Sequence, residues 1–137
     1  MSELATRMEA IKDSLAAAYP ARVVTRSLQD PALIDHEDLQ RGVYTVVSLA
    51  ERNYTNVAGY EAQDGAQRIL ILGDFVIQEN QPGSKIEDTE FTMIEEVKAW
   101  CRALPAELCL ISLLSVSQSG QTANPYGWIV CEAEYRP

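Results

Sequence analysis

Apolar residues recur every three or four positions in two segments of the chain, which predicts two amphipathic helices. The first helix is expected at about residues 3–19, with Ser2 as its N-cap. The second is expected at about 85–104, where Ser84 and Glu87 have the spacing of a capping box. The predicted core-facing residues are Leu4, Met8, Ile11, Leu15 and Ala18 in the first helix, and Ile86, Met93, Ile94, Val97, Trp100, Cys101 and Leu104 in the second.

Five other segments are rich in apolar and β-branched residues and predict β-strands. The run ELCLISLLSVSQ is almost unbroken in its apolar character, so we expect a central strand that is covered on both faces. Gly73 interrupts the run RILILGDFVI, which suggests a bulge or a bend. In the last strand, Ile129 and Cys131 are expected on one face, and Trp128 and Val130 on the other. The strands are placed at about residues 21–28, 42–50, 67–78, 107–118 and 127–136.

The order of these elements, α-β-β-β-α-β-β, predicts an α+β fold in a single domain, residues 1–137. A short, turn-rich loop, SGQTANPYG, joins the last two strands, which favours antiparallel pairing between them. We therefore expect one mostly antiparallel β-sheet of about five strands, with two α-helices packed on it.

A long link, ERNYTNVAGYEAQDGAQ, separates the second and third predicted strands. A tight hairpin needs only about two to five linking residues, and Asp64-Gly65 is itself a hairpin signal. We therefore expect a long β-hairpin arm over residues 51–66. Tyrosines are favoured at protein interfaces, although the same side chains could instead fold back as a lid on their own core. The residues expected at an interface with a neighbouring subunit or another protein are Tyr54, Val57, Tyr60 and Asp64.

The charge balance excludes some kinds of partner. The formal net charge is −9, and the eleven Lys and Arg residues are scattered along the chain. Proteins that grip nucleic acid normally present a basic patch, so sequence-specific nucleic-acid binding is disfavoured. The longest apolar runs are far shorter than the ~20 residues that span a bilayer. Charged residues also interrupt the N-terminal segment where a signal peptide would be apolar. We expect a cytoplasmic protein with no membrane anchor.

No constellation of residues in the sequence predicts catalysis. His36 lies among three acidic residues, but neighbours in sequence point in different directions, so a solvated acidic loop is the preferred interpretation. The stretch PGSK fits the start of a capped helix better than a phosphate-binding loop, because it lacks the upstream glycine and the following hydroxyl. None of the serines on the fourth strand lies in a GxSxG setting.

Two further groups have a simpler structural interpretation. Glu132 and Glu134 lie on one strand face and could act as paired carboxylates, although a wet or interfacial face is favoured. Three cysteines, Cys101, Cys109 and Cys131, lie in apolar neighbourhoods and are expected to be reduced thiols in the core. A metal site is not expected, because no CxxC pair exists and only one histidine is available. The sequence therefore predicts no catalytic residue, no cofactor-binding residue and no metal site, and we expect a protein that is not an enzyme.

The elements follow one another in a recognisable order. An opening amphipathic helix ends at AAAYP, and a strand pair lies around GVYTVVSL. The excursion ERNYTNVAGYEAQDGAQ then leads to the apolar strand RILILGDFVI. The acidic-capped helix EDTEFTMIEEVKAWCRAL and a final hairpin ending in WIVCEAEYRP complete the chain. In this layout the chain resembles small phage tail-assembly proteins, specifically the tail terminator (minor tail protein U-like) family. The resemblance covers nearly the whole chain and rests on element order, with no short invariant motif.

The resemblance implies a structural role. Tail terminators of long-tailed phages form a six-fold ring on the finished tail tube, stop its polymerisation and present the head-joining surface. The implied partners are further copies of the chain in a homo-hexamer (formed free or only on the tail tube), the tail-tube protein and a head-completion or connector protein. The implied location is the host cytoplasm during assembly and the virion tail.

DNA passes through such a ring, and an acidic lining would let it slide without sticking. The residues expected to face that channel are Asp35, Glu37, Asp38, Glu132 and Glu134. Two alternatives stay open. The chain could be a head–tail connector or another tail-assembly protein of similar fold. It could also be a small α+β ligand-binding domain or enzyme, whose signature would be a deep apolar pocket between helices and sheet with convergent polar groups.

Overall fold

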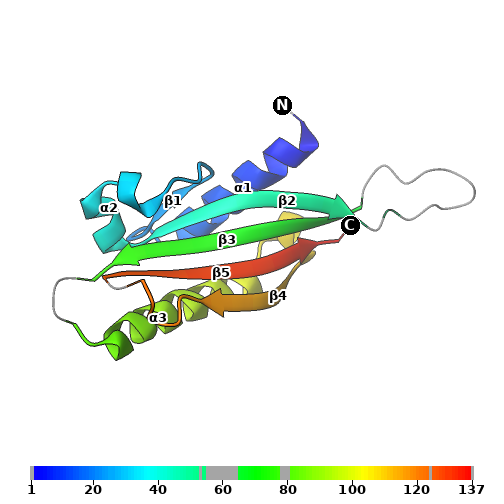
Figure 1. Ribbon diagram of the computed structural model, residues 1–137. Helices are drawn as coiled ribbons and strands as arrows, with labels where there is room; N and C mark the ends of the chain where they lie inside the picture. Colours follow the sequence, from blue (N-terminus) through cyan, green and yellow to red (C-terminus); the bar gives the residue numbers. More distant parts are fainter. Residues whose placement is uncertain (1, 53, 55–64, 78–80, 124, 137) are drawn as a thin grey trace, which may run out of the picture.

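The fold is built on one five-stranded sheet with the strand order β1-β2-β3-β5-β4 (Figure 1). A computed structural model describes residues 2–52, 54, 65–77, 81–123 and 125–136. Strands β1 and β2 pair in parallel, and the other three pairs are antiparallel. This confirms the expected α+β class with a mostly antiparallel sheet. The strands are β1 (Val23–Thr25), β2 (Val43–Arg52), β3 (Ala66–Val76), β4 (Ile111–Gln118) and β5 (Tyr126–Tyr135).

Two long helices, α1 (Glu3–Ala18) and α3 (Gly83–Arg102), pack on the sheet as expected, and both lie on the same face (Figure 1). Their apolar stripes meet the sheet in one core, in which Ile11, Val97 and Ile129 are fully buried. The predicted stripe of α1 is wrong at its two ends, because Leu4 and Ala18 are exposed. The remaining helical elements are short: α2 (His36–Arg41) and the 3-10 turns η1 (Pro31–Leu33) and η2 (Ala106–Leu108). None of the described helices combines the length and apolar character that a membrane span requires.

The helix starts differ in how they are capped. The Ser2 hydroxyl accepts a hydrogen bond from the Ala5 amide at 3.1 Å, which confirms Ser2 as the N-cap of α1. The predicted capping box at Ser84 is wrong, because α3 already begins at Gly83. Its N-cap is Pro82, which makes no side-chain capping bond.

Gly73 does not mark a bulge, contrary to expectation. It lies in a regular ladder, where it pairs with Tyr44 on one side and Ile129 on the other. A Cβ atom at Gly73 would lie 2.8 Å from Ile129 Cγ1 and 2.9 Å from Met93 Cε. The glycine is therefore explained by the close approach of α3 to the sheet. The register shifts occur elsewhere, between Ser48 and Ala50 in β2 and between Leu113 and Ser115 in β4.

The prediction of a central fourth strand is wrong. Strand β4 lies at the edge of the sheet and pairs only with β5 among the described strands, and the run begins with η2 rather than with strand. Ile111 is buried in the core, but Leu110 and Leu114 are 47% and 46% exposed. The apolar run suggested burial on both sides, whereas the described residues cover only one side of the strand.

The segment around His36 is a helix, not the solvated acidic loop that was expected. The Asp35 carboxylate accepts a hydrogen bond from the Glu37 amide at 3.1 Å and caps α2. Leu39 is buried, and Gly42, at φ +85°, ends the helix in a backbone conformation that favours glycine. Acidic residues in a first helical turn are stabilised by the helix dipole, so the acidic cluster was a helix-start signal. Strand β1 is correspondingly shorter than predicted.

The cysteines match expectation in part. All three are free thiols, and Cys131 is completely buried in the core, where burial raises its pKa to about 12. Cys101 is half-buried beside it, and burial likewise raises its pKa. Cys109 is exposed, so the prediction of three core thiols is wrong at that position. It follows η2 at the surface rather than entering β4.

Candidate functional site

The predicted arm connects the last residue of β2, Arg52, to the first residue of β3, Ala66. The two strands stay paired as far as Arg52 and Ala66. Tyr54 is 53% exposed, and its hydroxyl donates a hydrogen bond to the Glu51 carboxylate. The other predicted interface residues, Val57, Tyr60 and Asp64, lie outside the described residues. The arm therefore stays a prediction. The residues that would carry it, Arg52 and Ala66, form the last pair of the β2–β3 ladder.

The predicted channel-lining acids fall into two separate groups. Asp35, Glu37 and Asp38 form the start of α2, directly before the first residues of β2. Glu134 shares a row of the sheet with Arg68, which pairs with Ala50 near the opposite end of β2. The structure therefore does not bring the two acidic groups together.

The second acidic group is largely compensated in charge. Glu132 forms an ion pair with Arg68 and accepts a hydrogen bond from Ser115 at 3.1 Å. These two contacts hold the pKa of Glu132 below its usual value. Glu134 pairs with Arg136 at 3.1 Å. Glu132 and Glu134 therefore do not form an unpaired carboxylate dyad of the kind that acid–base catalysis uses. That these two residues face a channel stays a prediction.

The sheet face opposite α1 and α3, here called the second face, is the most open surface of the sheet. The expected alternation along β5 is confirmed, because Ile129 and Cys131 enter the core whereas Trp128 and Val130 lie on the other side. Around Val43 and Thr45, a groove of about 170 Å³ is also lined by Ile34 and Asp38, so the connector and α2 reach this face only near the start of β2. Half-buried apolar side chains continue along it, here called the second-face stripe: Val47, Leu70, Leu72, Val76, Trp128 and Val130.

Asp74 lies on the second face in a row with Val43 and Trp128. Only 8% of the residue is exposed, and α2 packs against its strand. Burial raises the pKa of Asp74 to about 6. Sequence reasoning missed this residue, although the lone acid inside the apolar run ILILGDFVI was a visible signal.

Replacing Asp74 by Asn should stabilise the isolated chain by about 1 kcal/mol at pH 7.5. The pKa of Asp74 is raised from 3.8 to about 6, so the folded chain holds the proton more tightly than the unfolded chain does. Stability therefore falls as the pH rises between these two values, and the gain from Asn should vanish near pH 4. Urea denaturation of both proteins at pH 4 and 7.5 measures this, and a less stable variant at pH 7.5 would contradict it.

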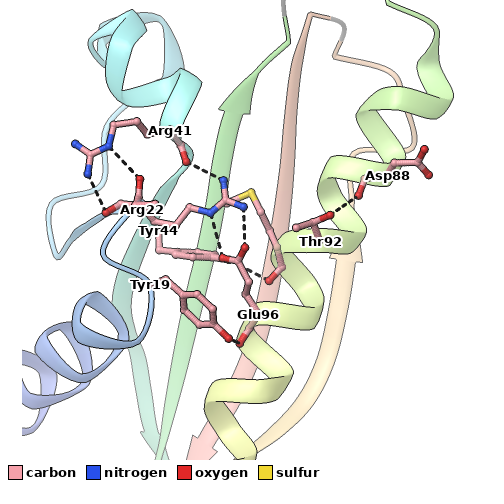
Figure 2. A network of polar contacts seen from close by, with 9 residues as sticks. Tyr19, Arg22, Arg41, Tyr44, Asp88, Thr92 and Glu96 are labelled. Carbon is pink, nitrogen blue, oxygen red and sulfur yellow. Dashed lines mark hydrogen bonds and ion pairs between the residues drawn. The ribbon is translucent and has the colours of Figure 1, made fainter.

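A polar network joins the end of α1, β2 and α3 (Figure 2). The Arg22 guanidinium donates to both carboxylate oxygens of Glu96, at 3.1 and 2.8 Å, and the two side chains are only 17% and 18% exposed. The Tyr44 hydroxyl, fully buried, lies 2.8 Å from Glu96 Oε1 and 3.0 Å from the Met93 carbonyl. Tyr19 donates to the Glu96 carbonyl at 2.8 Å. Sequence reasoning gave no sign of this network, because its members are far apart in the chain.

The network is built to hold elements together rather than to move protons. Burial and the Glu96 carboxylate raise the pKa of Tyr44, and the same causes raise that of Tyr19. Hydrogen bonding to Glu96 raises the pKa of Arg22. All three shifts raise a pKa that is already well above 7, so none of these three side chains is tuned for acid–base catalysis near pH 7.

Glu90 on α3 is a buried carboxylate that fastens the helix to the β4–β5 connection. It is 1% exposed and accepts hydrogen bonds from the Ser119 hydroxyl, from Gln118 Nε2 at 3.2 Å and from the Trp128 amide at 3.3 Å. Its position one helical turn after Ile86, in line with the apolar stripe, was the signal that sequence reasoning missed.

Glu90→Ala should lower the free energy of unfolding by about 2 kcal/mol, because it leaves buried donors without an acceptor. The exposed Asp88→Ala on the same helix is the matched control and should change stability by less than about 0.5 kcal/mol. Urea denaturation of the two variants measures the difference. Equal stability of both variants would show that Glu90 contributes nothing to the attachment of α3.

The remaining candidates offer little chemistry. His36 is exposed and lies 3.2 Å from the Gln40 side chain. Among the described residues, no group of three His, Cys, Asp or Glu side chains is arranged to hold a metal ion. A groove of about 290 Å³ beside α1 is lined by Arg7, Glu107 and Leu108 among others, and it lies at the lower limit of typical ligand sites.

Comparison with known proteins adds no relative. No protein-family model matches the chain, and no curated protein matches it significantly.

Proposed function

We propose that this protein is a structural subunit of a phage or prophage tail, a terminator that caps the tail tube as a ring and provides the head-joining surface. The proposal begins from the resemblance in element order. It gains support from the open edge of β4 among the described strands.

The observation that carries the proposal is the edge strand β4. Its outer side has no strand partner among the described residues, and Ile111–Gln118 contains neither a charged residue nor a proline. Proteins usually protect such edges with lysine, proline or a covering element, since a bare edge pairs with other chains. Here only the bulge at Leu114 interrupts the edge, and the Leu114 side chain is itself exposed. An edge of this kind suits a subunit that adds to its neighbour's sheet in a ring.

Deletion of the gene in the phage or prophage that carries it tests the role directly. A terminator predicts tails of uncontrolled length by electron microscopy. Heads that are empty or leaking, on tails of normal length, would favour the head–tail connector instead. Particles of normal form and infectivity would overturn both tail roles and leave the ligand-binding or enzymatic alternative.

The edge itself is tested by complementing the deletion with variants. Leu114→Lys places a charge on the edge of β4, and we expect it to fold but to fail in complementation. Leu33→Lys makes the same change at a position that is 76% exposed in η1, and it should complement fully. Circular dichroism and thermal melting of the purified variants establish that both are folded. Full complementation by Leu114→Lys would show that β4 is not an assembly edge.

A further inference from the structure

The second face of the sheet holds a carboxylate that nothing in the described chain neutralises. Asp74 is more than nine-tenths buried, yet no described residue donates a hydrogen bond to it or forms an ion pair with it. Buried carboxylates are normally paired or hydrogen-bonded. Asp74 is therefore unusual within its own fold.

The cations on the same face, Arg52, Arg68 and Arg136, lie away from Asp74. Arg68 pairs with Glu132, and Arg136 pairs with Glu134, both in the part of the sheet away from α2. Asp74 instead has the apolar side chains of Val43 and Trp128 as its cross-strand neighbours. Among the described residues Asp74 therefore has no counter-ion, and its carboxylate oxygens still reach solvent, because no completely buried side-chain oxygen there lacks a partner.

The surroundings of Asp74 indicate what else a partner must bring. The second-face stripe runs beside it through Leu72 and Val130, and these side chains are only half-buried. Apolar side chains gain free energy when they are covered. The surface thus combines one partly desolvated carboxylate with an adjoining apolar band.

We propose that Asp74 and the second-face stripe form a binding surface for a segment of another protein, which places an arginine or lysine on Asp74 and apolar side chains on the stripe. The net charge of −9 disfavours a second copy of this chain and favours a basic partner. A charge pair formed in a water-excluded setting gives specificity for the cationic segment. The binding surface is independent of the tail function proposed above.

Selection from a displayed library of random dodecapeptides tests the proposal on the full chain. Wild-type protein is the bait, and Asp74→Asn is used for counter-selection. Because Asn should not weaken the fold, a loss of binding cannot be ascribed to unfolding. We expect enriched peptides to carry an arginine or lysine between apolar residues and to bind the Asn variant at least tenfold more weakly. Replacing their arginine by citrulline, which removes the charge and keeps the shape, should have a similar effect.

Two controls separate this surface from general attraction to an acidic protein. Asp88→Asn removes a charge from an exposed position on α3 and should leave peptide affinity within twofold of wild type. Binding should also perturb the indole signal of Trp128 in NMR spectra, and not that of the core residue Trp100. Three outcomes would overturn the proposal: no peptide sensitive to Asp74, enriched peptides without a basic residue, or a self-associated protein that buries Trp128 against a second copy.

Discussion

Glu96→Ala should lower the free energy of unfolding by about 3 kcal/mol, a large effect for a residue on the polar side of a helix. The substitution leaves the Arg22 guanidinium without its two carboxylate bonds and removes one partner of the buried Tyr44 hydroxyl. The Arg22 charge is largely shielded from water, with 17% of its side chain exposed, so hydration compensates only in part. Urea denaturation at pH 7.5 measures the loss as a shift in midpoint at constant slope.

Glu95→Ala is the matched control for this experiment. Glu95 is the adjacent residue on α3, its side chain is 65% exposed, and its pair with Lys98 at 3.3 Å is a surface contact. Exposed pairs of this kind contribute about 0–1 kcal/mol. If Glu95→Ala proves as destabilising as Glu96→Ala, the network of Figure 2 does not hold α3 to β2 in the way described.

A double substitution refines the interpretation. Arg22→Ala together with Glu96→Ala should cost less than the sum of the single changes, because each single variant leaves a partly buried charge unpaired. The Arg22 contact with the Arg41 carbonyl, at 2.7 Å, is lost in either variant that lacks Arg22. Strict additivity would mean that the ion pair contributes no coupling.

The periodic parts of the fold could be predicted from the sequence, and the tertiary polar contacts could not. The stripe that includes Val97 and Trp100 specified both the existence and the buried face of α3, because a helix must bury its apolar side. The alternation along β5 specified its two faces for the same reason. The contact between Arg22 and Glu96 depends on how the residue before β1 and helix α3 lie in space, and no local pattern records that.

The error at β4 has a physical origin that bears on function. The run ISLLSVSQ has the composition of a covered strand, yet in the chain it forms an edge with Leu114 exposed. Apolar composition reports the environment in which a segment functions, which includes its partners. The mismatch between composition and position is therefore the same observation that supports assembly through β4. Asp74 presents the converse mismatch, a charged residue in a buried position.

Gly127→Ala should destabilise the protein by about 3 kcal/mol, although the change adds a single methyl group. Gly127 pairs across the sheet with Phe75, and a Cβ atom at this position would lie 2.1 Å from Phe75 Cζ. The aromatic ring thus lies over the glycine backbone and shields it, an arrangement known to compensate for glycine in a strand. Phe75 is 2% exposed and belongs to the core, so it has little room to move aside.

The test is a double-mutant cycle with Phe75→Leu, which shortens the side chain that the new methyl group would meet. Phe75→Leu alone should cost about 1–2 kcal/mol through lost packing. In the Gly127→Ala background it should cost much less or even restore stability, because it removes the overlap with Phe75 Cζ. Equilibrium unfolding of the four proteins yields the coupling energy, which should be favourable by more than about 1 kcal/mol. Independent effects at the two positions would mean that the backbone of β5 shifts to accommodate the methyl group, and that the ring over Gly127 does not restrict this part of the sheet.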